Sequence, residues 1–364
     1  MVEWKKLGEV CCIRTGKLNA NAQVENGKYP FFTCDAKPFR IDTFAFDTEA
    51  ILISGNGSQV GHLNYYKGKF NAYQRTYVID DFRDVNAFYL FHYLKSTIRP
   101  YVMDKSKKGS VPYITLPMLE GFIIPIPSLE EQTRIVGILD TFTSAIDNLK
   151  EQIAQRRKQY EYYRDQLLDL EGKPGVEMKF ITEVAKSFTG LTYKPENVSD
   201  SGTLVLRSSN INDDVLSFDD NVFVQMEIPE RARVQENDIL ICVRNGSKRL
   251  VGKAAMITKE AEGMAFGAFM TILRSFAINS KFLFYVWQSE KVRRQYKGDE
   301  AMPIAQITAK DFQRIVIPVP PPSEQQRIVS ILDTFEASIQ NLEAQLEQRE
   351  KQYEYYRNKL LTFE

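Results

Sequence analysis

The hydrophobic pattern of this chain is most regular in two long stretches, one in the middle and one at the C-terminus. In the first stretch, core-type positions recur in alternating steps of three and four residues, and neither Gly nor Pro interrupts them between residues 139 and 170. This heptad spacing is typical of a helix that buries one seam against a partner helix. The seam positions are Leu139, Phe142, Ile146, Leu149, Ile153, Arg156, Tyr160, Tyr163, Leu167 and Leu170.

The C-terminal stretch repeats this pattern. Residues 124–171 and 317–364 align without a gap at a constant offset of 193, and 29 of the 48 positions are identical. At about 1.5 Å per residue, roughly 40 helical residues form a rod of about 60 Å. Two equal rods in one chain most simply pack on each other. The second seam consists of Leu332, Phe335, Ile339, Leu342, Leu346, Arg349, Tyr353, Tyr356, Leu360 and Phe363.

Arg156 and Arg349 occupy equivalent positions in the two predicted seams. A charged residue in a helix seam costs stability and commonly fixes the register of the pair. A register role is therefore the preferred interpretation of both arginines.

The duplication extends beyond the rods. Residues 2–10 resemble residues 176–184 at an offset of 174, and Thr15-Gly16 matches Thr189-Gly190. The chain is therefore predicted to be a tandem duplication of a globular module followed by a rod. The predicted segments are a first module (1–123), a first long helix (124–171), a second module (172–316) and a C-terminal long helix (317–364).

Each module has the pattern of several strands and one buried helix. Within residues 51–61 and again within 239–252, an apolar strand runs into an Asn-Gly-Ser turn and out into a second strand. An apolar stretch at 88–94, with a counterpart at 282–287, indicates a buried helix. Each module then returns through an apolar strand that ends in Ile-Pro-x-Pro. The modules are therefore predicted to be strand-rich α+β domains of ordinary domain size.

The order of the segments limits how the rods can pair. An antiparallel pair returns the chain to the first module and gives a molecule with pseudo-two-fold symmetry. A parallel pair needs a connection that spans the whole rod, and the second module would have to supply it.

The overall charge is zero, but the charge is divided along the chain. The two globular segments together carry an excess of six positive charges, and the two rods carry the compensating six negative ones. Basic modules on an acidic scaffold are a mild indication of nucleic acid, and random scatter of surface charge explains the division equally well. With no long apolar run and no secretory leader, we expect a cytoplasmic protein.

The sequence offers little catalytic or metal-binding chemistry. The four cysteines show no Cys-x-x-Cys spacing and are predicted to be free thiols, buried or incidental. No phosphate-binding glycine motif is present. Of the two histidines, His92 lies in an apolar run and is predicted to be a core residue, whereas His62 follows the Asn-Gly turn and is a candidate surface contact. Neither has a companion nucleophile motif, so we predict neither a metal site nor a catalytic residue.

Binding is the remaining function class, and polar or basic side chains mark candidate DNA contacts. Arg, Lys, Asn and Gln pair with base edges and phosphates, and glycine lets the backbone approach closely. In the first module, a plain hairpin turn explains the Asn-Gly segment equally well, whereas Arg244, Lys248 and Arg249 exceed what a turn needs. The candidates are Asn56, Gly57, Ser58, Gln59, Lys67, Lys69, Gln74, Arg75, Lys105, Lys107, Lys108, Arg244, Asn245, Gly246, Ser247, Lys248, Arg249, Arg293, Arg294 and Lys297.

Some of these candidates have ordinary structural explanations. The lysines from 105 to 108 and the basic residues from 293 to 297 are predicted to lie in basic turns that follow the buried helices, and solvated helix ends are an equal alternative. The segment 65–75 interleaves aromatic and basic residues, as a sheet with core aromatics also does, so Gln74 and Arg75 are the weaker candidates.

With these features assembled, the chain resembles the specificity subunit of type I restriction-modification systems over its full length. No single motif carries the resemblance; the duplicated rod between two divergent modules does. The most specific marks are the Ile-Pro-x-Pro segments at Ile124 and Ile317, the EQxRIVxILD runs at 131–140 and 324–333, and KQYEYYR at 158–164 and 351–357.

The resemblance implies two target recognition domains that each read one half of a split double-stranded DNA site, with the antiparallel rods setting the gap. A rod of about 60 Å exceeds one duplex turn of about 34–36 Å. It also implies two methyltransferase subunits docked on the conserved regions and restriction subunits in the full complex. No cofactor is expected on this chain, since S-adenosylmethionine belongs to the methyltransferase, and we expect no catalysis by the chain alone.

Matching residues outside the seam are the predicted partner-binding positions, because the seam alone does not require them. They are Lys158, Gln159 and Glu161 in the first rod and Lys351, Gln352 and Glu354 in the second. An alternative function is a coiled-coil scaffold whose modules bind proteins rather than DNA. A third is the recognition part of a system that modifies DNA without cutting it, or of a type II relative.

Overall fold

The computed structural model describes residues 2–105, 112–296 and 306–363. Contacts divide the chain into two units. Unit 1 comprises Met1–Glu151 and Glu343–Glu364, and unit 2 comprises Gln152–Leu342. Each unit therefore holds one globular module together with parts of both long helices, α4 (Leu129–Leu168) and α8 (Pro322–Leu361).

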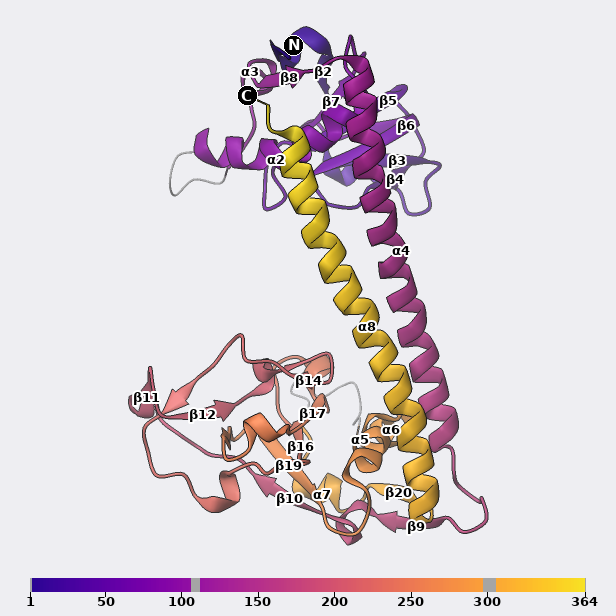
Figure 1. Ribbon diagram of the computed structural model, residues 1–364, viewed down its shortest axis with the longest axis vertical. Coiled ribbons are helices and arrows are strands. Elements are labelled where there is room, and N and C mark those ends of the chain that lie inside the picture. Colours follow the sequence, from indigo (N-terminus) through magenta and orange to yellow (C-terminus); the bar gives the residue numbers. More distant parts are fainter. Residues whose placement is uncertain (1, 106–111, 297–305, 364) are drawn as a thin grey trace. The chain divides into compact units, whose positions relative to one another are not determined.

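Unit 1 is built on a six-stranded sheet with the order β2-β7-β5-β6-β3-β4 (Figure 1). Neighbouring strands are antiparallel except β3 and β6, which are parallel. The strands are β2 (Cys12–Thr15), β3 (Tyr29–Phe32), β4 (Phe39–Ile41), β5 (Phe46–Ser54), β6 (Leu63–Ala72) and β7 (Thr76–Asp80). The helices of the module are α1 (Leu7–Val10), the 3-10 turn η1 (Ala20–Ala22), α2 (Ala87–Lys105) and α3 (Leu116–Glu120).

The second half of the central strand β5 is apolar from Ala50 to Ile53 because both of its faces are covered. Ile51 and Ile53 pack on one side with residues of α2, while Ala50 and Leu52 pack on the other with Phe70. Because both faces are covered, no polar position is tolerated in this part of the strand. The predicted buried helix lies within α2, where His92 is 3% exposed, so its prediction as a core histidine is confirmed.

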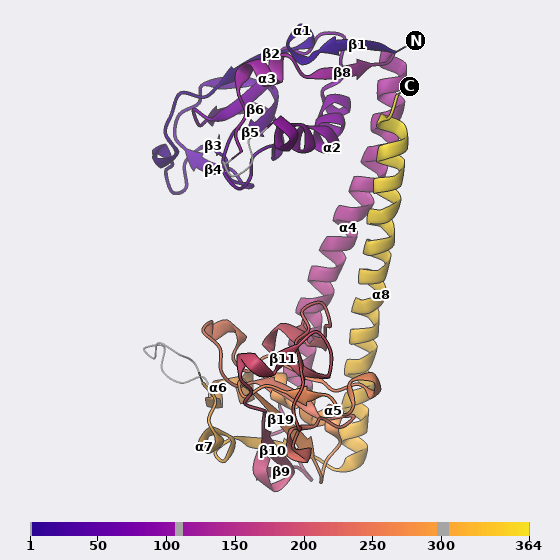
Figure 2. The same ribbon diagram turned by 90° about the vertical axis from the view of Figure 1, so that its left-hand side faces the viewer.

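A two-stranded ribbon brings the start of the module to the start of the long helix. Strand β1 (Glu3–Lys6) pairs antiparallel with β8 (Ile123–Ile126), as Figure 2 shows. Unit 2 repeats this ribbon with β9 (Glu177–Phe180) and β20 (Val316–Val319). The predicted return strands that end in Ile-Pro-x-Pro are therefore confirmed.

Unit 2 repeats the first four strands of the unit 1 sheet in the same order, β10-β19-β16-β17. A second sheet, β11-β15-β12-β18, holds the parallel pair β12–β18, the counterpart of β3–β6. The single strand β6 of unit 1 thus corresponds to two strands in unit 2. The strands are β10 (Ala185–Thr189), β11 (Val198–Ser199), β12 (Thr203–Leu206), β13 (Ile211–Asn212), β14 (Val215–Leu216), β15 (Phe223–Val224), β16 (Ile239–Cys242), β17 (Ala254–Met256), β18 (Ala265–Phe266) and β19 (Met270–Ser275).

The helices of unit 2 are short, apart from its parts of α4 and α8. The α-helices are α5 (Ser280–Gln288), α6 (Glu290–Tyr296) and α7 (Ala309–Phe312). The 3-10 turns are η2 (Ile181–Glu183), η3 (Pro195–Asn197), η4 (Ser208–Asn210), η5 (Glu230–Ala232), η6 (Lys248–Leu250) and η7 (Lys259–Ala261). The prediction of two strand-rich α+β modules is confirmed.

The matching Thr-Gly pairs have a common structural cause. Gly16 lies against the backbone carbonyl of Ala72, and Gly190 lies against that of Gly267, so closely in each case that a Cβ atom would overlap the carbonyl oxygen. Only glycine allows this approach. The duplicated motif therefore holds the end of β2 against the end of β6 in unit 1, and the end of β10 against the end of β18 in unit 2.

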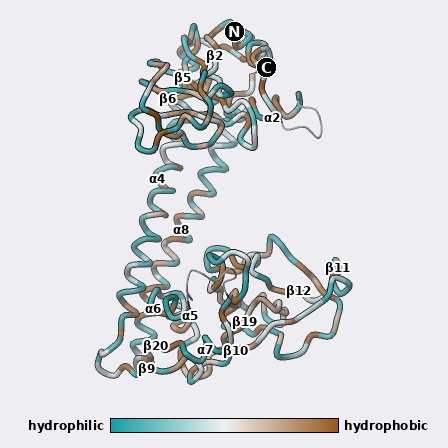
Figure 3. Tube along the Cα trace, turned by 180° about the vertical axis from the view of Figure 1, so that it is seen from behind, coloured by the Kyte–Doolittle hydropathy of each residue, from teal (hydrophilic) through white to brown (hydrophobic). Residues whose placement is uncertain are grey.

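The long helices pair antiparallel, as predicted. In unit 1 the ring of Phe142 stacks on Tyr356 at 5.2 Å between centroids, and in unit 2 Tyr163 stacks on Phe335 at 5.4 Å. These two stacks join equivalent positions of the repeat, with the roles of the helices exchanged. Figure 3 shows apolar residues recurring among polar ones along both helices.

The structure corrects three local predictions. The long helices are shorter than the predicted ranges 124–171 and 317–364. Prolines keep the first residues of those ranges in strands β8 and β20. Ser128 then caps α4 by accepting a hydrogen bond from Glu131 N–H at 3.3 Å. Arg293 and Arg294 lie in helix α6 rather than in a turn, because Ser289 ends α5 and its hydroxyl accepts from Val292 N–H at 3.4 Å. Tyr163 stacks across the seam but is half exposed, whereas Arg164 is buried.

Candidate nucleic-acid interface

In unit 1, three loop segments that are distant in sequence are joined by backbone hydrogen bonds. The N–H of Gly55 donates to the carbonyl of Arg75 at 2.9 Å, and the N–H of Ile114 donates to the carbonyl of Gly55 at 2.8 Å. A further backbone bridge joins Asn56 to Tyr113. The loop after β5, the turn before β7 and the segment before α3 therefore form one surface, which we call the loop platform.

Unit 2 contains the same platform. The N–H of Val243 donates to the carbonyl of Phe269 at 3.0 Å, and the N–H of Ile307 donates to the carbonyl of Val243 at 2.8 Å. A backbone bridge joins Arg244 to Gln306. Position by position, this network matches that of unit 1, so the two modules present corresponding backbone positions on the same frame.

The side chains that leave the platform are largely exposed. Tyr113 and Phe269 keep 59% and 58% of their surface, which is unusual for aromatic side chains. The guanidinium of Arg244 lies over the Phe269 ring at 5.3 Å from its centroid, a cation–π contact that orients it. The thiol of Cys34 donates to Oδ1 of Asn56 at 3.0 Å and so fixes that amide.

The remaining candidates of the first module divide into two groups. Gly57, at positive φ, has open space around it, and Ser58 and Gln59 are exposed in the same loop, next to the platform. Gln74 lies in the platform turn and its Nε2 donates to Asn19 Oδ1 at 3.0 Å. The second group lies away from the loop, on strand β6: Lys67 pairs with Glu49 at 3.8 Å, and Lys69 lies over the Phe44 ring.

In the second module, the platform loop continues as a polar turn. Asn245 donates from Nδ2 to Ser208 Oγ at 3.2 Å and accepts from Ser247 N–H at 2.9 Å, so Gly246 closes an Asx turn. Lys248 and Arg249 follow in the exposed turn η6. The basic residues of this loop therefore follow Arg244 within five positions along the chain.

The other basic candidates lie outside the platform. Lys105 is exposed at the end of α2, and Arg294 pairs with Glu290 within α6 at 3.2 Å. Arg293 is partly buried in the same helix. Lys107, Lys108 and Lys297 lie outside the described residues.

Sequence reasoning missed three platform residues, namely Tyr113, Phe269 and Gln306. They belong to segments of ordinary composition and become neighbours only through backbone hydrogen bonds between distant loops. One signal could have found two of them: Ile114-Thr115 and Ile307-Thr308 are identical dipeptides at the repeat offset of 193, directly after Tyr113 and Gln306.

The duplicated Glu-Gln motif anchors each module to its long helix. Gln132 accepts a hydrogen bond from Asn86 N–H at 2.7 Å and donates to the carbonyl of Pro127 at 2.9 Å. In unit 2, Gln325 accepts from Asn279 N–H at 2.9 Å and donates to Pro320 at 2.9 Å. Both amides are buried, which explains why the motif recurs.

Beside these glutamines, the two modules meet the helices through different polar contacts. In unit 1, His92 Nε2 lies 2.9 Å from Asp140, and burial lowers the pKa of His92 despite the opposing hydrogen bond. In unit 2, the equivalent aspartate, Asp333, accepts from Tyr285 at 2.6 Å and pairs with Lys281 at 2.8 Å. Burial raises the pKa of Tyr285. The same position of the repeat thus contacts a histidine in unit 1 and a tyrosine and a lysine in unit 2.

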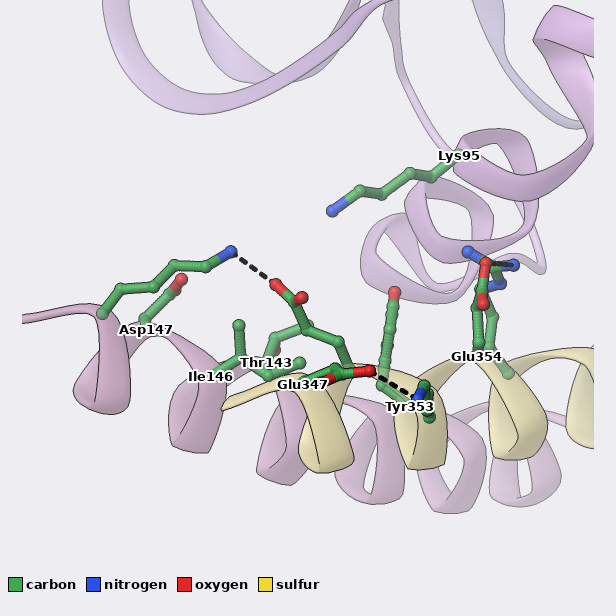
Figure 4. Close-up of a pocket in the computed structure, with 11 residues that line it drawn as sticks. Lys95, Thr143, Ile146, Asp147, Glu347, Tyr353 and Glu354 are labelled. Atoms are coloured by element: carbon green, nitrogen blue, oxygen red, sulfur yellow. Dashed lines mark hydrogen bonds and ion pairs between the residues drawn. The ribbon is translucent and has the colours of Figure 1, made fainter. Parts of the chain in front are cut away.

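A charged groove of about 560 Å³ lies between α2, α4 and α8 in unit 1 (Figure 4). Its walls carry two ion pairs, Lys150–Glu350 at 3.0 Å and an i, i+4 pair between Glu347 and Lys351 at 2.5 Å. Lys95 extends toward this groove in Figure 4, and burial lowers its pKa. Since four of these charges are already paired, the groove is a less suitable anion site than the platform.

The exposed face of each long helix carries an aromatic pair. Tyr162 and Tyr163 contact each other edge-on at 5.4 Å, and their counterparts Tyr355 and Tyr356 do so at 5.3 Å. Tyr162 and Tyr355 are each 61% exposed. The predicted partner-binding residues flank these pairs: Lys158, Gln159 and Glu161 are exposed, as are Lys351 and Glu354, while Gln352 is half-buried and accepts from Arg349 at 2.9 Å.

The described residues contain no group of three or more His, Cys, Asp or Glu side chains that could hold a metal ion. None of the helices described is long and apolar enough to cross a membrane. The cysteines are free; Cys11 and Cys242 are buried, and Cys12 and Cys34 partly so.

The fold and the platform define a class of protein: two modules with one backbone frame and different exposed side chains, each joined to an antiparallel helix pair. The family model described as "Type I restriction modification DNA specificity domain" matches residues 1–156 and 174–350. The chain belongs to this family. Its function is accordingly DNA specificity in type I restriction-modification.

Individual relatives agree with this assignment. The chain is 40% identical over 164 residues to the type I restriction enzyme EcoDI specificity subunit of Escherichia coli, a match that spans 44% of this chain and 36% of that protein. A putative type I restriction enzyme specificity subunit of Haemophilus influenzae is 26% identical, over 100% of this chain and 96% of its own length.

The fold also matches a solved structure. The crystal structure of the type I restriction-modification S subunit from M. genitalium has a TM-score of 0.62 and 17% sequence identity, covering 100% of this chain and 97% of that one. At this identity the likeness shows the fold alone.

Proposed function

We propose that each module of this chain reads one half of a bipartite double-stranded DNA site and that the paired helices set the gap between the halves. The single observation that carries this proposal is the loop platform, which recurs with the same backbone hydrogen bonds in both modules. A conserved frame with different exposed side chains suits two recognition surfaces that dock on DNA alike and read different bases.

The platform's chemistry favours base reading over binding to a generic polyanion. Its side chains include two guanidiniums, two amides and two aromatic rings rather than a cluster of lysines, and all of them except the partly buried Asn56 are exposed. Guanidinium and amide groups make bidentate hydrogen bonds to base edges in the major groove, whereas lysines mainly neutralise phosphates. The exposed Lys248 and Arg249 beside Arg244 supply candidate phosphate contacts.

The chain acts through partners in this proposal. Two methyltransferase subunits dock on the exposed helix faces around Tyr162 and Tyr355, and they bring the S-adenosylmethionine; restriction subunits join for cleavage. The support is the recurrence of the same exposed tyrosine pair, with the same flanking charges, on each helix. Exposed tyrosines of this kind are frequent at the centres of protein interfaces. The chain itself supplies no catalytic group and needs no cofactor.

The central experiment is to sequence methylated adenines in DNA from a host that expresses this chain with its methyltransferase. We expect a motif of two defined halves with a fixed gap between them. A single continuous motif, or methylation that is independent of this chain, would refute the proposal. Methylation of DNA by the purified chain and S-adenosylmethionine alone would refute the non-catalytic assignment.

Docking is tested separately by counting methyltransferase subunits per chain by mass photometry. We expect Tyr162→Ala and Tyr355→Ala each to lose one of two subunits and the double variant to lose both. Ser144→Ala, an exposed position on the same helix but 18 residues before Tyr162, is the matched control and should retain two. Full assembly of the double variant would place the partner elsewhere. A protein-binding scaffold that ignores DNA would assemble but show no sequence-dependent binding.

A further inference from the structure

The two platforms present three corresponding positions each. The first follows the central strand and is held by a backbone bridge: Asn56 in unit 1 and Arg244 in unit 2. The second is the turn whose carbonyl accepts from the loop: Arg75 and Phe269. The third is the opposite end of the bridge: Tyr113 and Gln306.

The same three chemical types occupy these positions in both modules, in a different order. Unit 1 has an amide, a guanidinium and an aromatic ring at the first, second and third positions. Unit 2 has a guanidinium, an aromatic ring and an amide. The residues that hold the frame do not change in this way: Ile114 and Ile307 are the same residue, both are buried, and both donate the same hydrogen bond.

These three types are among those that discriminate bases in the major groove. A guanidinium pairs with the two acceptors of guanine, an amide pairs with the donor and acceptor of adenine, and an apolar side chain contacts the thymine methyl group. A different order of the same types on one frame therefore presents a different base preference at each step along the groove.

We propose that Asn56, Arg75 and Tyr113 in module one, and Arg244, Phe269 and Gln306 in module two, are the specificity-determining residues that read base edges of double-stranded DNA. This inference rests on the proposed function and adds to it which side chains choose the bases. It includes three residues that lie outside the polar loops, and it excludes Lys67 and Lys69, whose strand positions lie off the platform.

The test moves the chemistry of one platform onto the other. In the full chain, co-expressed with its methyltransferase, Arg244→Asn, Phe269→Arg and Gln306→Tyr are combined so that module two carries the side chains of module one. Methylated motifs are sequenced, and binding of the assembled complex to duplexes carrying the old motif is measured. We expect the half-site of module two to change, with the other half and the gap preserved, and affinity for the old motif to fall at least roughly tenfold.

A matched control exists within the same module. Phe276 is 58% exposed, like Phe269, and lies beneath the ammonium of Lys186 at 5.9 Å, but it is not part of the platform. Arg231 is exposed on the turn η5. The combination of Arg231→Asn with Phe276→Arg should leave both half-sites unchanged.

The outcomes separate this inference from the proposed function. Thermal unfolding first establishes whether the triple variant is folded. If the wild-type complex gives a two-part motif and the folded triple variant gives the same motif, the inference is overturned and the proposed function stands. If the wild type gives no two-part motif, both are overturned. If the triple variant unfolds, Gln306→Tyr alone decides, since Gln306 is exposed: one altered base in one half supports the inference, and an unchanged motif overturns it.

Discussion

Gln325 offers a direct test of how the repeated motif holds a module to its helix. Its side chain is 4% exposed and makes two hydrogen bonds, one from the N–H of Asn279 at 2.9 Å and one to the carbonyl of Pro320 at 2.9 Å. Asn279 is also the N-cap of α5, where its side chain accepts from Phe282 N–H. The substitution Gln325→Ala would therefore leave two groups unpaired: the partly buried N–H of Asn279 at the start of α5 and the buried carbonyl of Pro320 before α8.

The expected loss follows from these two groups. Leaving a buried polar group without a partner costs about 1–3 kcal/mol, so the two groups together cost roughly 3 kcal/mol, taking the lower half of the range for the partly buried N–H. For a unit of this size, 1 kcal/mol shifts the thermal unfolding midpoint by about 2–4 °C, so we expect Gln325→Ala to lower that midpoint by roughly 9 °C.

Trp287 provides the assay. It is 1% exposed, lies in unit 2 with Gln325 and stacks on Phe312, so its fluorescence should change when the unit unfolds. Trp4, the other tryptophan, is half exposed in unit 1, and a Trp4→Phe background removes its signal.

The control lies in the same turn of α8. Arg327 makes two short hydrogen bonds to Glu324, both at 2.7 Å, but the pair is largely solvent-exposed. Exposed pairs contribute little, so Arg327→Ala should shift the midpoint by less than about 2 °C. A shift for Gln325→Ala that is no larger than that of Arg327→Ala would refute the reasoning, since it would mean that the buried amide contributes no more than a surface ion pair.

Three further predictions follow from single contacts. Burial lowers the pKa of His92, so the neutral imidazole contributes stability at pH values above its ordinary pKa of 6.5, and this contribution is lost as the pH falls below 6.5. Between about pH 7.5 and 5.5, the thermal unfolding midpoint should therefore fall less in His92→Gln than in the wild type, and parallel curves would contradict this. Gly190→Ala forces a Cβ atom into the Gly267 carbonyl and should cost at least about 3 kcal/mol in urea unfolding, whereas Gly246→Ala, with nothing near its Cβ, should cost under about 1 kcal/mol; equal costs would disprove the close approach. Arg274 makes two hydrogen bonds of 2.7 Å to buried Asp238, so Arg274→Met should lower the free energy of unfolding by roughly 3 kcal/mol, because it leaves that carboxylate without its cation. Arg274→Met combined with Asp238→Asn should recover part of this loss. No recovery would mean that packing, not charge, dominates.

Most of the fold could be predicted from the sequence, because its signals are local or repeated. The heptad steps located both helices, and the duplicated seam implied that the helices pair. The residues alone left the direction open, the family resemblance implied the antiparallel one, and the stacks of Phe142 on Tyr356 and Tyr163 on Phe335 confirm it. The burial of Arg164 could not be foreseen from the seam alone, since the seam pattern treats its neighbour Tyr163 as the core residue.

The candidate site was predicted only in part, for a physical reason. Asn56, Arg75 and Arg244 stood out because their side chains are polar and lie near turns. Tyr113 and Phe269 did not, since an aromatic residue in a sequence usually indicates core. Only the backbone bridge of Tyr113 to Asn56 and the hydrogen bonds from Val243 and Arg244 to the Phe269 carbonyl place them beside those polar groups. The split of β6 into two strands in unit 2 likewise depends on an insertion whose path the sequence does not specify.

The exchange of roles in the two aromatic stacks has a genetic consequence. Because the copies align at a constant offset of 193, a crossover between them at any matching codon deletes 193 of the 364 residues without disturbing the heptad phase. The product is one module followed by one helix, and that helix still carries both a phenylalanine and a tyrosine at the stacking positions. Each product chain therefore contains both halves of the contact. The duplicated gene can lose a recognition module by recombination and still encode a helix with a complete, self-complementary seam.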